Sequence, residues 1–132
     1  MTYAAAYIGA LVVFGIIDAI WLSWAVPAVY KPMFGDQLAD PIRMVPAAVF
    51  YFSFPVGVVV FAIAPALKEN SALLALGLGA LFGLVAYGTY DLTNHATLKF
   101  FTAQAAMMDI AYGTVTIALS ALGGYFAARL VA

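Results

Sequence analysis

Four long apolar stretches, separated by short polar segments, dominate the sequence. They cover about residues 3–26, 44–67, 71–98 and 101–128. Crossing about 30 Å of hydrocarbon takes roughly 20 helical residues, so each stretch is long enough to span a membrane. An unpaired backbone group in lipid is costly, and the stretches lack the alternation of barrel strands. The pattern therefore predicts an all-α integral membrane protein, a single domain of four transmembrane helices.

The connections between these stretches are uneven in length. Residues 28–43 contain two prolines and four charged side chains, which predicts a polar loop. The second connection, Lys68 to Asn70, and the third, around Lys99 to Thr102, are short turns typical of antiparallel neighbours. An antiparallel up-down bundle with both termini on one side follows. The few Lys and Arg residues do not decide which side that is.

Composition and charge narrow the class of protein further. Hydrophobic residues make up 67% of the 132 and charged residues 8%, which excludes an ordinary soluble domain. The net charge of -1 offers no basic surface to nucleic acid. The absence of cysteine removes disulfides, thiolate metal sites and thiol catalysis. The first stretch lacks a basic start and an A-x-A cleavage site, so we interpret it as an uncleaved helix.

Ionisable and polar residues recur at one depth in the four stretches. At 1.5 Å per helical residue, Asp18, Tyr51, Asp91 and Asp109 lie about 10 to 13 Å inside the same membrane face. A charge at such depth costs about 2.5–3.5 kcal/mol, so we expect these side chains to face the interior of the bundle. Few cations accompany the three carboxylates, so at least one of them should hold a proton.

Aromatic and amide side chains stand at helical spacing beside these groups. The candidates for lining a ligand pocket are Asp18, Trp21, Tyr51, Tyr87, Tyr90, Asp91, Asn94, Asp109 and Tyr112. The alternative is that the carboxylates only cross-link helices, as polar groups in membrane bundles often do.

No motif identifies a cofactor or a catalytic residue. His95, the only histidine, follows Asp91 by one helical turn, but no H-E-x-x-H or E-x-x-H pattern accompanies it, so we predict no metal site. The serines lack a G-x-S-x-G context and a second histidine. These residues leave open whether the protein is an enzyme.

Several motifs resemble those of a known family. The Y-G-T-Y-D-L-T-N run from Tyr87 to Asn94, the A-T-L-K that follows it and the D-I-A at Asp109 are similar to a family of small bacterial predicted membrane proteins of unknown function. The D-A-I-W-L run at Asp18 and the later Tyr30 match as well, so the resemblance covers nearly the whole chain. It implies a four-helix fold in the bacterial inner membrane, and no reaction.

The chain departs from that family at three places. Members often have a Gly-Trp pair where this chain has Phe100-Phe101, a Trp at the position of Tyr112 and an apolar residue at that of His95. The last difference argues against an essential histidine.

Three functions fit these observations. The first is a pocket that binds or processes a small or lipidic ligand, opening toward the face of the first and third connections. The second is a proton-coupled carrier acting as an oligomer. The third is an accessory subunit of a larger membrane complex. The lipid bilayer is the partner common to all three, and we expect the first.

Overall fold

The computed structural model describes residues 1–132, and helices form all of its regular structure. The elements in chain order are α1 (Thr2–Ala25), η1 (Val26–Tyr30), α2 (Lys31–Phe34), η2 (Gly35–Gln37), α3 (Met44–Val58), η3 (Val59–Ile63), α4 (Ala64–Lys68), α5 (Ala72–Thr97) and α6 (Ala103–Val131). They make four helical stretches that are long and apolar enough to cross a membrane. The predicted all-α fold with four helices of membrane-spanning length is confirmed.

The first helical stretch differs from the predicted boundary. The sequence predicts a polar loop over residues 28–43, whereas η1 and α2 continue the helix to Phe34 and η2 adds a 3-10 turn to Gln37. Gly35 ends the α-helix with a φ of 62°, a left-handed conformation that glycine adopts without strain. Non-helical chain is therefore confined to residues 38–43 of this connection.

Both π-helical segments come shortly before a proline. η1 ends two residues before Pro32, and η3 ends two residues before Pro65. A proline ring clashes with the carbonyl four residues earlier in a regular α-helix. In η3 the Ala64 N–H donates to Val59 O, five residues back, and this wider turn accommodates the ring. α3 continues through Pro55, and the π-helical irregularity of the second stretch follows it, at η3.

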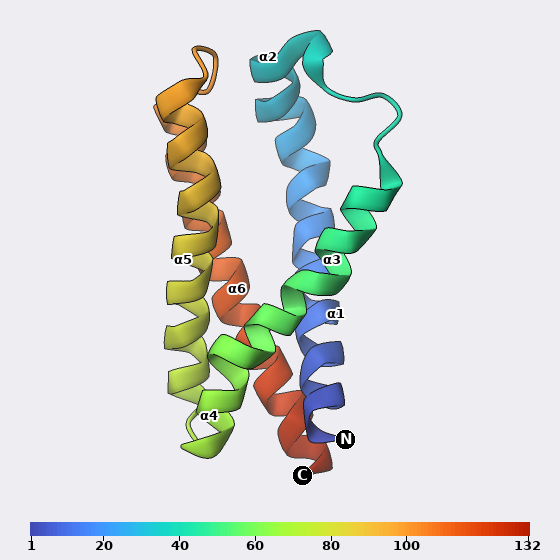
Figure 1. Cartoon of the computed structure of the whole chain (residues 1–132), viewed down its shortest axis with the longest axis vertical. Helices are drawn as coiled ribbons and strands as arrows, with labels where there is room; N and C mark the ends of the chain where they lie inside the picture. The colour runs from blue at the N-terminus through green and yellow to red at the C-terminus, as the bar shows by residue number, and fades with distance from the viewer.

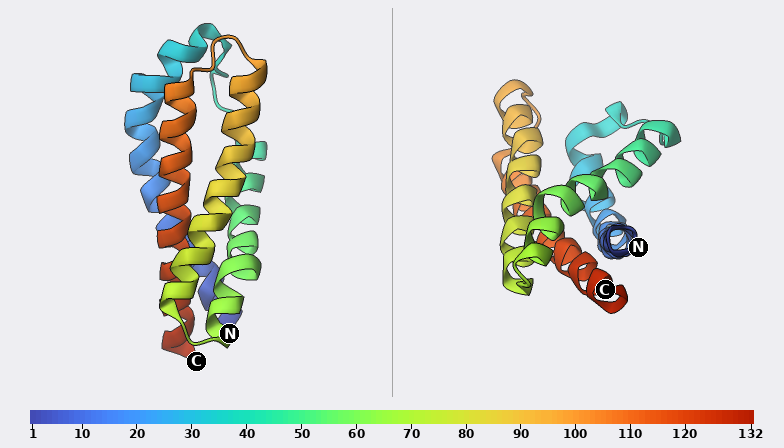
Figure 2. Two further views of the ribbon diagram at one scale, coloured as in Figure 1. Left: turned by 90° about the vertical axis from the view of Figure 1, so that its left-hand side faces the viewer. Right: turned by 60° about the horizontal axis from the view of Figure 1, so that its bottom comes forward.

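The four stretches alternate in direction, and both termini lie at the end of the molecule that contains α4 (Figure 1, Figure 2). The opposite end contains α2 and the connection between α5 and α6 (Figure 1). α6 packs along both α5 and α1. On the second stretch, η3 contacts α5, whereas α3 packs against α1 and diverges from α5 (Figure 1).

Side chains on α1 show how the bundle is packed. One face is fully or almost fully buried at four-residue spacing, with two alanines followed by a phenylalanine and an aspartate: Ala6, Ala10, Phe14 and Asp18. The opposite face is large and apolar, with about half or more of each side chain exposed: Ile8, Val12, Ile16 and Ile20. Small residues inside allow close helix contact, and large apolar residues outside suit a lipid solvent.

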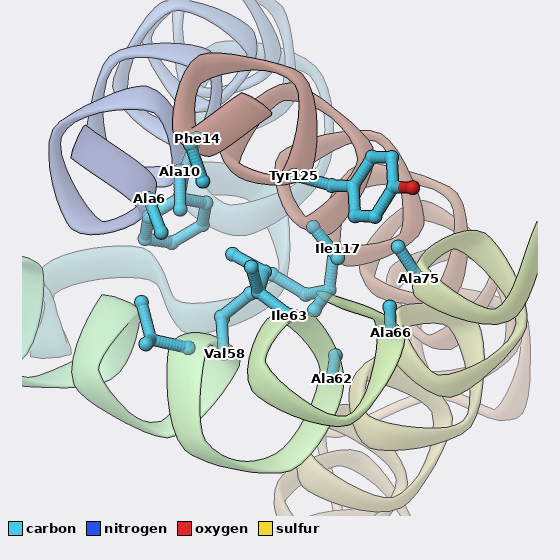
Figure 3. Close-up of a cluster of buried hydrophobic side chains, with 13 residues drawn as sticks. Ala6, Ala10, Phe14, Val58, Ala62, Ile63, Ala66, Ala75, Ile117 and Tyr125 are labelled. Atoms are coloured by element: carbon cyan, nitrogen blue, oxygen red, sulfur yellow. The ribbon is translucent and has the colours of Figure 1, made fainter. Parts of the chain in front are cut away.

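The half of the bundle nearest the termini contains a tightly packed apolar core (Figure 3). Ala62, Ala66 and Ala75 are fully buried there beside Ile63 and Ile117. In the other half, the divergence of α3 from α5 leaves room for a cavity.

The small-residue positions of α5 and α6 face each other inside this bundle. A Cβ at Gly79 would lie 2.7 Å from Ala121 Cβ and 3.0 Å from Ala118 Cα, closer than real Cβ contacts. Ala75, Gly79 and Gly83, which stand at four-residue spacing on α5, are therefore used for helix packing within the chain.

Gly79→Val is expected to destabilise the fold by about 1–3 kcal/mol, because the added side chain must force α5 away from α6. Gly77→Val on the exposed face of the same helix is the matched control, since nothing lies within 4 Å of its Cβ position. Thermal unfolding of the purified variants in detergent measures the difference. Equal losses in both variants would contradict this close helix contact.

Candidate ligand-binding site

A cavity of about 390 Å³ lies between α1, α3, α5 and α6, in the half of the bundle away from the termini. Its lining residues are Asp18, Trp21, Leu22, Tyr30, Phe50, Tyr51, Phe54, Ala86, Tyr87, Tyr90, Asp109 and Tyr112. Eight of these 12 are aromatic, two are carboxylates and none is a cation. The volume is within the range of small-molecule sites.

The cavity is open on the side of the bundle. Three of its lining residues, Leu22, Phe50 and Tyr90, are 37%, 40% and 53% exposed. They belong to α1, α3 and α5, the helices that border the gap created by the divergence of α3.

Asp18 is the centre of a hydrogen-bond network that joins three helices. The Tyr112 hydroxyl of α6 donates to Asp18 Oδ1 at 2.6 Å, and the Tyr51 hydroxyl of α3 donates to Asp18 Oδ2. Trp21, one turn after Asp18, stacks on the Tyr112 ring with centroids 4.3 Å apart. Both oxygens of this 7% exposed carboxylate therefore have a donor, as a buried acceptor requires.

Asp109 and Asp91 form a second polar cluster, which we call the carboxyl pair. The Tyr30 hydroxyl donates to Asp109 Oδ1 at 2.9 Å. The Asp109 carboxyl also neighbours that of Asp91, which is fully buried. No donor reaches either oxygen of Asp91.

The carboxyl pair is unstable if both groups are ionised. Two carboxylates offer only acceptor atoms, so a hydrogen bond between them requires a proton on one of them. Like charges side by side in a low dielectric repel strongly, and no Lys or Arg lines the cavity to offset them. The pair therefore needs a proton or another positive charge beside it.

The π turn of η1 brings Tyr30 to this cluster. On a regular helix the inward positions after Asp18 and Ala25 would reach residue 29, about one turn later. The extra residue of the π turn shifts the inward position by one, so that Tyr30 contacts Asp109. Pro32, which follows this turn, is the sequence feature that accompanies the shift.

Tyr87 is held in place by the backbone of α6. Its ring packs directly against Gly113, where a Cβ would overlap the ring atoms. Its edge also meets the Tyr112 ring at a centroid distance of 6.0 Å. A glycine at this position thus lets an aromatic wall approach the helix that bears Asp109.

Most of the predicted candidates meet at the cavity. Those that line it are Asp18, Trp21, Tyr51, Tyr87, Tyr90, Asp109 and Tyr112. Asp91 is fully buried next to Asp109 and Asn94 is partly buried, and neither of them lines the cavity.

Five of the lining residues are not predicted from the sequence: Leu22, Tyr30, Phe50, Phe54 and Ala86. Four of them are apolar and indistinguishable from lipid-facing residues by type. Tyr30 is the important omission, because the prolines and charges around it predict a loop. The one feature of the sequence that marks Tyr30 is that it is among the positions that match the family.

His95 has a different role in the structure. Its Nδ1 lies 2.6 Å from the Phe101 carbonyl, so it joins the end of α5 to the start of α6. No group of three histidine, aspartate or glutamate side chains is arranged to hold a metal ion.

A match to known sequences covers nearly the whole chain. The family described as "Predicted membrane protein (DUF2177)" matches residues 3–126. No curated protein and no solved structure matches the chain.

Proposed function

Because the chain belongs to the DUF2177 family of predicted membrane proteins, which names no activity, we propose its function from the cavity: it binds a small amphipathic or lipidic molecule inside the membrane. The observation that supports this most directly is a cavity of about 390 Å³ with aromatic walls and a carboxylate floor. Sites for small organic molecules are mostly apolar with a few converging polar groups. The family resemblance suggests the inner membrane of a bacterium as its location.

The position of the cavity favours a ligand that enters from the bilayer. The exposed lining residues Leu22, Phe50 and Tyr90 border its lateral opening. An amphipathic molecule can place its polar end beside Asp109 while its apolar part remains between α3 and α5 or in lipid. Such a path requires no opening to water.

The hydrogen-bond pattern distinguishes this proposal from a purely structural layer. In a purely structural layer, every buried acceptor is expected to have a hydrogen-bond donor, as Asp18 has in Tyr51 and Tyr112. Asp91 departs from that rule, because both of its oxygens lack a donor. Small-residue positions on membrane helices could also hold a partner helix of a larger complex. In this chain they are occupied internally, since Gly79 packs on α6 and the Ser120 hydroxyl donates to Ala10 O of α1 at 2.8 Å.

The proposal is tested with Trp21 as a fluorescent reporter. The chain has two tryptophans, so Trp24→Phe leaves Trp21, in the cavity wall, as the sole source of tryptophan emission. The probe is 2-bromododecan-1-ol, whose hydroxyl can donate to a carboxylate and whose bromine, on the next carbon, quenches tryptophan on contact. We expect quenching that saturates with probe concentration.

The control for this experiment fills the cavity. In the Trp24→Phe background, Ala86→Phe places a ring in the cavity and should abolish the saturable component. Ala96→Phe, on an exposed position of the same helix, should retain it. Quenching that rises linearly in all three proteins would indicate partition into the detergent alone and would refute the proposal.

A further inference from the structure

The charge balance of the cavity indicates the chemistry of its ligand. Asp18 is fully hydrogen-bonded to Tyr51 and Tyr112, but the carboxyl pair of Asp91 and Asp109 is not offset by any cationic lining residue. An anionic ligand would be repelled by Asp109. A neutral ligand would leave the pair dependent on its proton, whereas a cation beside Asp109 would stabilise the ionised form directly.

The walls indicate what kind of cation fits. A metal ion needs several oxygen or nitrogen ligands, and no such group of three acidic or histidine side chains is present. Aromatic faces, in contrast, attract organic ammonium groups through the ring quadrupole. Trp21, Tyr30, Tyr87, Tyr90 and Tyr112 all line the cavity together with Asp109.

From this juxtaposition we propose that the ligand is a lipophilic organic cation, with an ammonium head held by Asp109 and the surrounding aromatic rings. The inference rests on the proposed binding function and specifies the ligand's charge. Asp91, the buried neighbour of Asp109 with no donor on either oxygen, adds to the negative potential that attracts the head. The apolar part of the ligand lies toward Phe50 and Phe54 at the lateral opening.

The test compares two probes of the same shape and different charge. Benzyltrimethylammonium is the cation, and neopentylbenzene is its neutral isostere, with carbon in place of nitrogen. Both are titrated into the Trp24→Phe protein in detergent while Trp21 emission is followed. We expect the cation to bind at least about tenfold more tightly than the isostere, a difference within the range of a desolvated cation–π and charge interaction.

Substitutions assign the preference to the carboxyl pair. Asp109→Asn keeps an oxygen acceptor for Tyr30 and should reduce the affinity for the cation by about tenfold without changing that for the isostere. If Asp109→Asn fails to fold, Asp91→Asn removes the other carboxyl group of the pair and tests the same contribution of negative charge. Asp36→Asn, at an exposed site in η2, is the control and should leave both affinities unchanged.

The outcomes separate this inference from the proposed function. Equal saturable binding of both probes would overturn the cationic ligand and leave the cavity as a binding site. A cation preference that persists in both carboxyl variants would also overturn it. The absence of a saturable change in Trp21 emission with either probe and with 2-bromododecan-1-ol would refute the binding function itself.

Discussion

Asp91→Asn is expected to stabilise the protein by about 1–4 kcal/mol while weakening the binding of a cationic probe. The wild-type carboxyl is fully buried and no donor reaches either of its oxygens. The asparagine amide has the same shape, has no charge to desolvate and can donate a hydrogen bond to Asp109. Thermal unfolding of the purified protein should show a midpoint several degrees higher, since about 1 kcal/mol shifts it by that amount in a domain of this size.

The control for this prediction is Asp36→Asn, because Asp36 is exposed and its replacement should change stability by less than about 0.5 kcal/mol. A gain in stability coupled to a loss of binding is the expected behaviour of a group kept for function. A loss of stability on Asp91→Asn would instead mean that the ionised carboxyl is part of the structural framework.

Helical geometry explains how much of this arrangement the sequence predicts. The rise per helical residue is fixed, so the number of residues between each aspartate and the end of its helix gives its depth in the membrane. Together with the two short turns, this places Asp18, Asp91 and Asp109 at one depth. The cost of exposing a carboxylate to lipid then requires each of them to face inward. These two constraints act on each helix separately, so they need no knowledge of how the helices pack.

The remaining features depend on packing between helices, which local sequence does not specify. The register change that directs Tyr30 toward Asp109 arises from a π turn, and a proline with nearby charges predicts a loop equally well. The cavity exists because the second stretch contacts α5 through η3 while α3 diverges from it. Phe50 and Phe54 therefore line a cavity, although their apolar character alone equally fits a lipid-facing surface.

Asp18→Leu is expected to cause the largest loss of stability, about 2–5 kcal/mol. The carboxylate accepts hydrogen bonds from Tyr51 on α3 and from Tyr112 on α6, and therefore joins these helices to α1. A leucine of similar size leaves both hydroxyls without this acceptor in a partly buried, aromatic environment. Thermal unfolding and the yield of monodisperse protein in detergent measure the loss.

Removal of the tyrosine hydroxyls should reverse most of this effect. When all partners of a buried hydrogen bond are replaced by apolar groups of similar shape, the net change is small, because no polar group remains unsatisfied. The triple variant Asp18→Leu/Tyr51→Phe/Tyr112→Phe should thus be more stable than Asp18→Leu alone. Tyr51→Phe/Tyr112→Phe with the aspartate intact should be destabilised, because that variant leaves the carboxylate without donors.

The wild type, Asp18→Leu, the double tyrosine variant and the triple variant form a thermodynamic cycle. Its coupling free energy measures the interaction between Asp18 and the two tyrosine hydroxyls. We expect a coupling of at least about 2 kcal/mol, since two charge-assisted hydrogen bonds are involved. A coupling near zero would mean that Asp18 stabilises the bundle independently of the two tyrosines. The triple variant also separates the two polar clusters: it retains Asp91, Asp109 and Tyr30, so a cation site formed by the carboxyl pair should still prefer benzyltrimethylammonium over neopentylbenzene after the Asp18 network has been removed.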